Sequence, residues 1–234
     1  MHTFTIDPKV AARVKARTGK DHPFDILDAR RTALLVIDLQ NYFMKPGAQG
    51  ETAAARAIVP AVNGLAAGLR SRGGHVVWIR NGTAGTRQTW STFHDYLMTP
   101  ERQNRRYSAM DKDGDGFAFW HELDIRPEDG KIEKKRFSAF IQGSSPLQDY
   151  LLGRELDTVL VAGTATNVCC ESTARDAMML NFRTLMISDA LAARSDEIHS
   201  ASLHGFYSNF GDVQTCAEVI VSLDRGTGQD RATG

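Results

Sequence analysis

The sequence contains few cysteines, no surplus of charge and no long apolar run. Only three of its 234 residues are cysteine, namely Cys169, Cys170 and Cys216. Three thiols cannot all pair, and two of them are adjacent, so the sequence argues against a disulfide scaffold and predicts a reducing, cytoplasmic environment. Basic and acidic residues number 28 each, which gives a formal net charge of zero. This balance provides no electrostatic reason to expect nucleic acid or an anionic membrane as a partner.

Signals for membranes and secretion are also lacking. No window approaches the roughly 18 consecutive apolar residues of a membrane-spanning helix. The first ten residues, MHTFTIDPKV, contain no basic stretch followed by an apolar run, so no signal peptide is expected. With no internal repeat and a length that suits one large domain, the sequence predicts a soluble globular protein.

Short apolar runs alternate with helical periodicity along the chain. Continuous apolar runs typical of strands buried on both faces occur at 32–37, 75–79, 158–162 and 184–187, and a short strand is expected within 131–140. Apolar residues at helical spacing indicate helices at 52–72, 144–154 and 168–180. Strands that alternate with helices predict an α/β fold, a three-layer α/β/α sandwich with a mostly parallel, Rossmann-like sheet.

The remaining segments divide the chain further. Residues 1–30 are polar, with a short helical stretch at 9–17, and predict an N-terminal arm before a domain at 31–225. Residues 226–234 are Gly-rich and predict a flexible tail. Between 81 and 129 the periodicity disappears, which is typical of an active-site cover or a binding loop system.

Reactive side chains stand at or just beyond the predicted ends of three strands. Asp38 ends the first apolar run, Lys134 lies in the short strand within 131–140, and Cys169 follows the run at 158–162, near a helix start. In open α/β sheets the carboxyl ends of the strands meet at one edge. A helix N-terminus and a nearby ammonium lower the pKa of a thiol, so a Cys169 thiolate is expected near neutral pH. A carboxylate could exchange protons with the thiol and with a leaving amine.

Three stretches of the sequence resemble the isochorismatase-like cysteine hydrolases. They are ALLVIDLQNYF with Asp38, EKKRFSAF with Lys134, and VAGTATNVCCESTARDAMMLNF with Cys169, and the resemblance extends over about residues 32–221. It implies that these three residues are the catalytic triad of an amidohydrolase that acts through a thioester intermediate. It also implies a cis peptide bond between Thr164 and Ala165, and an oxyanion hole made by the backbone N–H groups of Ala165 and Cys169.

The resemblance is greatest to the ureidoacrylate and N-carbamoylsarcosine amidohydrolases. It implies a small amide, ureido or carbamoyl substrate, with Asn81, Trp90, Phe43 and Phe140 as substrate-binding residues. The metal-binding histidines of the nicotinamidase branch have no counterpart around His94, so neither a catalytic metal nor another cofactor is expected. Family members form dimers or tetramers, which implies a homo-oligomer.

Two alternatives remain open. An isochorismatase-type vinyl-ether hydrolase would share the fold, but such enzymes generally lack a cysteine at the nucleophile position. The segment from Asp111 to Glu122 matches the anchor positions of an EF-hand calcium loop, although Pro127 and Gly130 interrupt the helix that should follow it. Cys170 and Cys216 are expected to be core residues.

Overall fold

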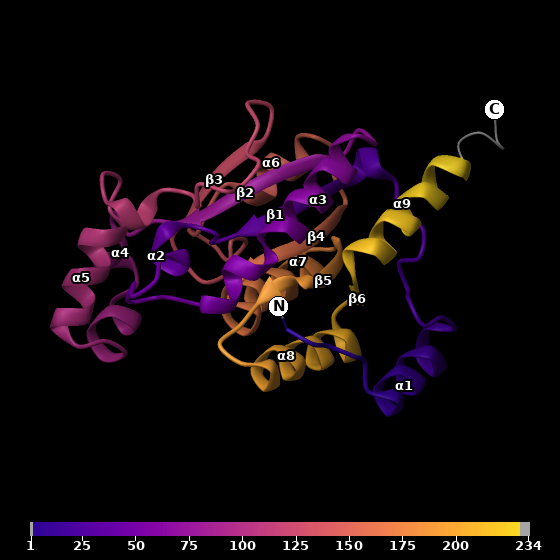
Figure 1. The fold of residues 1–234 in the computed structure, drawn as a ribbon, viewed down its shortest axis with the longest axis horizontal. Helices are drawn as coiled ribbons and strands as arrows, with labels where there is room; N and C mark the ends of the chain where they lie inside the picture. Colours follow the sequence, from indigo (N-terminus) through magenta and orange to yellow (C-terminus); the bar gives the residue numbers. More distant parts are fainter. Residues whose placement is uncertain (1, 230–234) are drawn as a thin grey trace.

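A six-stranded, all-parallel sheet forms the centre of the molecule in the computed structural model, which describes residues 2–229 (Figure 1). The strand order is β3-β2-β1-β4-β5-β6. The strands are β1 (Thr32–Ile37), β2 (His75–Asn81), β3 (Gly130–Lys134), β4 (Thr158–Thr164), β5 (Arg183–Ala192) and β6 (Asp212–Gln214). Each strand predicted from an apolar run is present, and the parallel α/β prediction is confirmed.

Helices cover both faces of this sheet. They are α1 (Pro8–Thr18), α2 (Asn41–Met44), α3 (Val59–Arg70), α4 (Thr86–Thr89), α5 (Pro100–Met110), α6 (Leu147–Leu152), α7 (Glu171–Met179), α8 (Asp196–Asn209) and α9 (Cys216–Gln229). Short 3-10 or π turns complete the set: η1 (Ala29–Arg31), η2 (Ala53–Ile58), η3 (Thr92–Tyr96), η4 (Asp115–Phe117) and η5 (Thr166–Cys170). Within residues 2–229, no helix is both long and apolar enough to cross a membrane.

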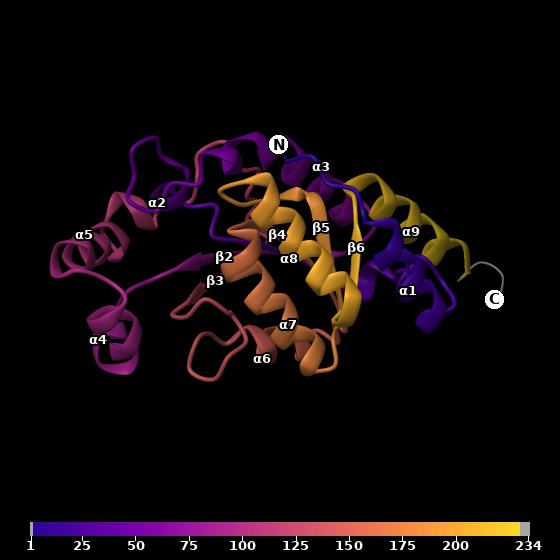
Figure 2. The same cartoon turned by 90° about the horizontal axis from the view of Figure 1, so that it is seen from below.

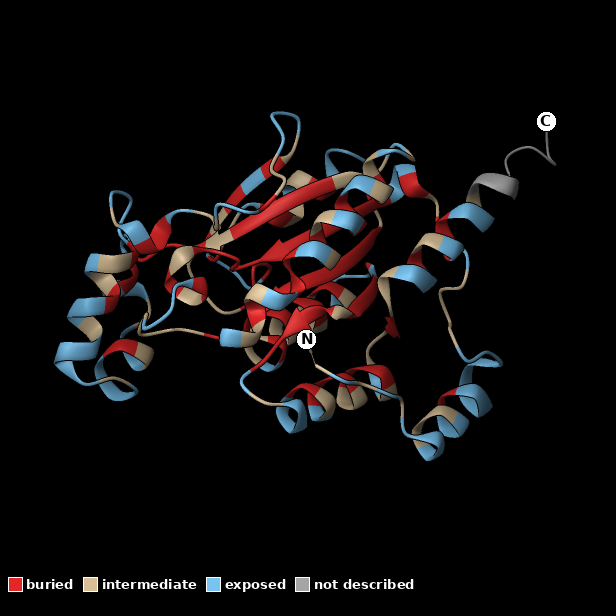
Figure 3. Ribbon diagram, in the orientation of Figure 1, coloured by how far each residue is buried: buried red, intermediate tan, exposed pale blue. Residues whose placement is uncertain are grey.

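Alternation along the strands creates two apolar cores. In β1, Leu35 and Ile37 pack with α1, α6, α7 and α8, whereas Leu34 and Val36 face α3 and α9. All six residues of β1 are buried, because helices cover both sides of the strand. Figures 2 and 3 show these layers and the buried strands between them. The continuous apolar runs in the sequence follow from this arrangement.

The N-terminal segment packs on its own chain. Asp7 caps α1 by accepting hydrogen bonds from the backbone N–H groups of Lys9 and Val10. The arm then lies against α8 and β6: Arg17 donates to the Ser208 carbonyl at 2.7 Å, and His22 Nδ1 lies 3.0 Å from Asp212 Oδ1. This polar segment therefore contributes to the domain that it precedes.

The C-terminal helix is longer than the sequence indicates. α9 begins at Cys216 and continues to Gln229, into the stretch expected to be a flexible tail from residue 226, while residues 230–234 lie outside the described part of the chain. A Cβ on Gly226 would lie 2.0 Å from the Leu27 carbonyl oxygen. Glycine therefore allows α9 to approach the N-terminal segment closely, and Leu27 N–H donates to the Ser222 carbonyl at 3.0 Å.

A second glycine sets the distance between the two central strands. Gly163 in β4 pairs with Ile37 in β1 and has a φ of +115°, a value that L side chains rarely adopt. A Cβ there would lie 2.0 Å from the Ile37 carbonyl oxygen. Ile37 immediately precedes Asp38, so this close contact also positions the start of the loop after β1.

We expect Gly163→Ala to lower the free energy of unfolding by at least about 3 kcal/mol, because both the φ angle and the contact with backbone are unfavourable. Gly143→Ala is the matched control, since Gly143 has a φ of +74° but no atom within 4 Å of the added Cβ. It should cost only about 1–2 kcal/mol. Urea unfolding measures both, and equal losses would show that the contact with Ile37 is unimportant.

Candidate active site

A buried ion pair connects the carboxyl ends of β1 and β3. Lys134 Nζ lies 2.8 Å from Asp38 Oδ2, and neither side chain is exposed to solvent. Lys134 also donates a hydrogen bond to the Arg136 carbonyl oxygen at 3.0 Å. Beyond Lys134 and a hydrogen-bonding interaction with the Cys169 thiol, the Asp38 oxygens have no donor among the described residues. The carboxylate therefore retains the capacity to accept a proton.

The backbone around Asp38 is unusual for a strand end. Its φ is +57°, a left-handed conformation that is uncommon for residues with a side chain, although Asp adopts it more readily than most. Its N–H donates to the Ile79 carbonyl of β2 at 2.8 Å. Residues held in this region cluster at functional sites.

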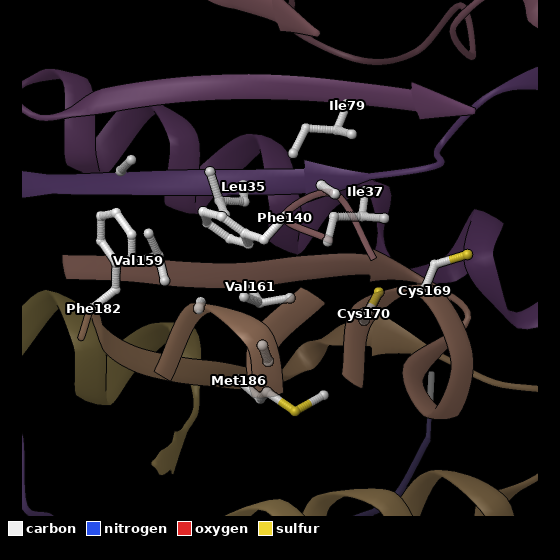
Figure 4. Close-up of a cluster of buried hydrophobic side chains, with 14 of the residues drawn as sticks. Leu35, Ile37, Ile79, Phe140, Val159, Val161, Cys169, Cys170, Phe182 and Met186 are labelled. Carbon is white, nitrogen blue, oxygen red and sulfur yellow. The ribbon is translucent and has the colours of Figure 1, made fainter. Parts of the chain in front are cut away.

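Cys169 lies in η5, the turn that connects β4 to α7. The Thr164–Ala165 peptide bond at the end of β4 is cis, as the resemblance predicts. Cys169 is buried, with 6% of its surface exposed, and lines a pocket of about 450 Å³ together with Ala165. Figure 4 shows Cys170 among the core side chains, whereas the Cys169 sulfur lies beside the ends of the neighbouring strands. The two adjacent thiols thus have different surroundings.

Burial and the negative charge of Asp38 raise the pKa of the Cys169 thiol to about 12, although the Lys134 ammonium acts in the opposite direction. Burial by itself lowers the pKa of Lys134, but the charges of Asp38 and Cys169 raise it above its ordinary value. Both shifts favour a neutral thiol beside a charged lysine. This differs from the thiolate expected near neutral pH, because burial and Asp38 together outweigh Lys134.

This raised pKa predicts a steep pH dependence of alkylation. Only the thiolate is nucleophilic, so below its pKa its fraction rises about tenfold per pH unit. In a Cys170→Ala/Cys216→Ser background, alkylation of Cys169 by iodoacetamide should accelerate from pH 7 to pH 10 without levelling off. Glutathione is the reference for a thiol of ordinary pKa. A plateau at or below pH 8 would mean that Lys134 dominates and that the resting residue is a thiolate.

The ion pair predicts a particular pattern of stability. Asp38→Asn leaves an unpaired buried ammonium, and Lys134→Met leaves an unpaired buried carboxylate, so each should lower the free energy of unfolding by roughly 3–5 kcal/mol. The double variant removes both charges and should be more stable than the sum of the two losses predicts. Urea unfolding of the three variants tests this, and strictly additive losses would contradict it.

Polar side chains connect this site to β2. Gln40, which is fully buried, accepts a hydrogen bond from Asn81 N–H at 2.7 Å and donates to the Asn81 and Gly116 carbonyl oxygens. The Asn81 side chain donates to the Arg136 carbonyl at 3.3 Å, the same oxygen that Lys134 contacts. Gln40 was not identified from the sequence, although it stands two residues after Asp38.

The four residues expected to bind substrate lie in different places. Asn81 and Phe43 line the pocket. Trp90 is not among its lining residues, since it stacks on Phe93, with ring centroids 4.3 Å apart, behind the pocket wall. Phe140 also lies outside the lining, because it packs against Phe182 in the core at 5.5 Å (Figure 4). Neither the Trp90 ring nor the Phe140 ring therefore lines this pocket in the structure.

The segment without periodicity forms one wall of the pocket. It carries α4, η3 and α5, which lie beyond the carboxyl ends of the strands in Figures 1 and 2. Phe93, Leu97 and Arg106 from this segment line the pocket. Arg106 was missed by sequence reasoning, because three arginines occur in α5 and no pattern distinguishes them.

The EF-hand-like segment uses its carboxylates for contacts within the protein. Asp115 Oδ2 lies 2.8 Å from Lys45 Nζ, and Glu122 accepts from Trp120 Nε1 at 3.1 Å. No helix follows Glu122, since residues 123–129 form turns and irregular backbone that lead directly into β3. Among the described residues, no group of three or more His, Cys, Asp or Glu side chains is arranged to hold a metal ion.

Comparison with known proteins gives matches over most of the chain. The family model for the isochorismatase domain matches residues 32–218. The ureidoacrylate amidohydrolase RutB of Caulobacter segnis is 29% identical over 209 residues, which cover 82% of this chain and 85% of that protein.

Solved structures show the same similarity. A cysteine hydrolase from Pseudomonas syringae pv. phaseolicola matches with a TM-score of 0.76 and 26% identity, covering 86% of this chain and 95% of that one. An N-carbamoylsarcosine amidase from Thermoplasma acidophilum matches with a TM-score of 0.63 and 26% identity, covering 80% and 96% of the two chains. The similarity therefore extends over most of the chain.

Proposed function

Because this chain belongs to the isochorismatase family of hydrolases, we propose that it is a cysteine-dependent amidohydrolase that cleaves a C–N bond of a small amide, ureido or carbamoyl compound. The observation that carries this proposal is the buried Lys134–Asp38 ion pair next to a thiol in a pocket wall. The similarity to an N-carbamoylsarcosine amidase and a ureidoacrylate amidohydrolase supports the substrate class.

The first half of the reaction follows from the resting protonation states. Because the thiol is neutral, it must lose its proton as the sulfur attacks the substrate carbonyl. Asp38, which interacts with the thiol by charge and by a hydrogen bond, is the proposed base. The attack forms an S–C bond and moves the carbonyl π electrons onto oxygen. The backbone N–H groups of Ala165 and Cys169, two residues that line the pocket, are the proposed donors to this oxyanion.

In the second half, the tetrahedral intermediate collapses and its C–N bond breaks. The departing nitrogen takes the proton held by Asp38 and leaves as ammonia or an amine. Water then attacks the thioester while Asp38 accepts its proton, and the C–S bond breaks as the sulfur regains a proton. Lys134 stays charged throughout, because its pKa is raised, and it stabilises whichever of its two neighbours carries the negative charge.

The proposal predicts that hydrolysis depends on one of the three cysteines. A panel of amides, ureides and carbamoyl compounds should release ammonia or amine with the unmodified protein. Cys169→Ala and Cys169→Ser should lower the rate by about 10³-fold or more, because neither group forms the thioester.

Cys216→Ser is the control, since Cys216 stands at the start of α9 and does not line the pocket. It should retain activity close to that of the parent. Circular dichroism and Tm measurements should show that all three variants are folded. Substantial hydrolysis by Cys169→Ala would overturn the covalent mechanism and favour hydrolysis by water, as in the vinyl-ether alternative.

A further inference from the structure

A buried hydroxyl joins two of the segments that carry the reacting side chains. Thr173, in the first turn of α7, is fully buried. Its Oγ1 donates a hydrogen bond to the Cys169 carbonyl oxygen at 2.7 Å and accepts one from the Ala139 N–H group at 3.1 Å. Cys169 lies in η5, and Ala139 lies in the loop after β3. Neither hydrogen bond takes part in the proposed reaction, although one of them ends on its nucleophile.

Only the second of these hydrogen bonds is unusual. A threonine hydroxyl in a helix commonly donates to the carbonyl four residues earlier, which is the relation of Thr173 to Cys169. Ala139, in contrast, is 34 residues away in the sequence and has no exposed surface. A buried N–H group that is cut off from water needs an acceptor, and the Thr173 hydroxyl provides it. Thr173 therefore connects η5 to the loop after β3.

The loop after β3 also holds the Lys134 ammonium. Lys134 is the last residue of β3 and donates to the Arg136 carbonyl oxygen at 3.0 Å. Ser144 Oγ donates to the Ser138 carbonyl at 2.6 Å, so the end of the loop is bonded back to its middle. Ser138 immediately precedes Ala139. Moving Ala139 is therefore expected to move the carbonyl that orients Lys134.

We propose that Thr173 is a positioning residue that holds Cys169 in place relative to the Asp38–Lys134 pair. The Cys169 thiol interacts with both members of this pair by charge and by a hydrogen bond. Its placement therefore decides whether the proton can transfer as the S–C bond forms, and a misplacement of about 1 Å can slow a reaction about 100-fold. This inference rests on the proposed function for the reaction that is assisted, whereas the bridge itself rests on its two hydrogen bonds.

Thr173→Val tests this role in hydrolysis. Valine keeps the shape of the side chain and removes the hydroxyl, which leaves the Ala139 N–H group without its acceptor. With a substrate found by the amide panel, kcat should fall by about tenfold, the effect of one lost hydrogen bond, while KM changes by less than about twofold. KM is expected to change little because Thr173 is not among the described residues that line the pocket. Thr173→Ser restores the hydroxyl and should recover most of the kcat.

Thr32→Val is the matched control. The Thr32 hydroxyl is equally buried and donates to the Asp28 carbonyl oxygen, also at 2.7 Å. Thr32 stands at the start of β1, whereas Asp38 follows the end of that strand. This variant should lower Tm to a similar extent as Thr173→Val but keep the kcat of the parent. An equal loss of kcat in the two variants would show that Thr173 contributes to stability alone and would overturn the proposal.

Alkylation tests the bridge without a substrate. In the Cys170→Ala/Cys216→Ser background, Thr173→Val should accelerate the reaction of Cys169 with iodoacetamide at pH 8 by about threefold or more, because water reaches the thiol and the thiolate fraction rises. The sulfur forms an S–C bond, iodide leaves with the C–I bonding electrons, and the thiol proton passes to the buffer. Slower hydrolysis together with faster alkylation would show that positioning is lost while the nucleophile remains reactive.

Two further measurements cover a failure of Thr173→Val to fold. Thr173→Ala removes the same hydroxyl, favours the helix and should give the same results. In the unmodified protein, the Ala139 amide should be strongly protected from exchange with deuterium, and exchange at the rate of an unstructured peptide would overturn the proposal. An unchanged kcat and alkylation rate in a folded variant would also overturn it. Faster alkylation in a protein that hydrolyses none of the panel would reject the proposed function and keep the bridge.

Discussion

The buried ion pair between Lys134 and Asp38 is the interaction on which the site depends. Both side chains are fully removed from water, at a cost of several kcal/mol for each ion that only close pairing and further hydrogen bonds can offset. The Arg136 carbonyl supplies one of those bonds to Lys134. The pair keeps a negative charge beside Cys169, and this charge, together with burial, raises the pKa of the thiol.

The fold brings the two ions together from strands that are not neighbours. β2 lies between β1 and β3, so both side chains must reach across its carboxyl end. Asp38 does so with a left-handed backbone conformation and a hydrogen bond to Ile79. Gly163 permits β4, which leads to Cys169, to approach β1 at the same level. Backbone geometry thus determines how close the carboxylate, the ammonium and the thiol can lie.

The sequence predicts most of this framework and less of the pocket. Strands buried on both faces produce continuous apolar runs, so their positions could be predicted, and Asp38 directly follows one of them. Lys134 ends the short, partly exposed strand β3, which has no such run. The pocket depends on the segment between β2 and β3, which has no periodicity. Nothing in the sequence separates Arg106 from Arg105, although one is buried and the other exposed. The pKa of Cys169 likewise depends on burial, which motifs do not reveal.

Charge balance distinguishes the buried Asp38–Lys134 pair from the pocket wall around Arg106. Asp38 and Lys134 neutralise each other, so the buried ion pair needs no further counter-ion. Arg106 has no carboxylate partner among the described residues, and it is linked to the ion pair through Asn81 and the Arg136 carbonyl, which also accepts from Lys134. These hydrogen bonds therefore fix Asn81, which lines the pocket, relative to the buried Lys134 ammonium.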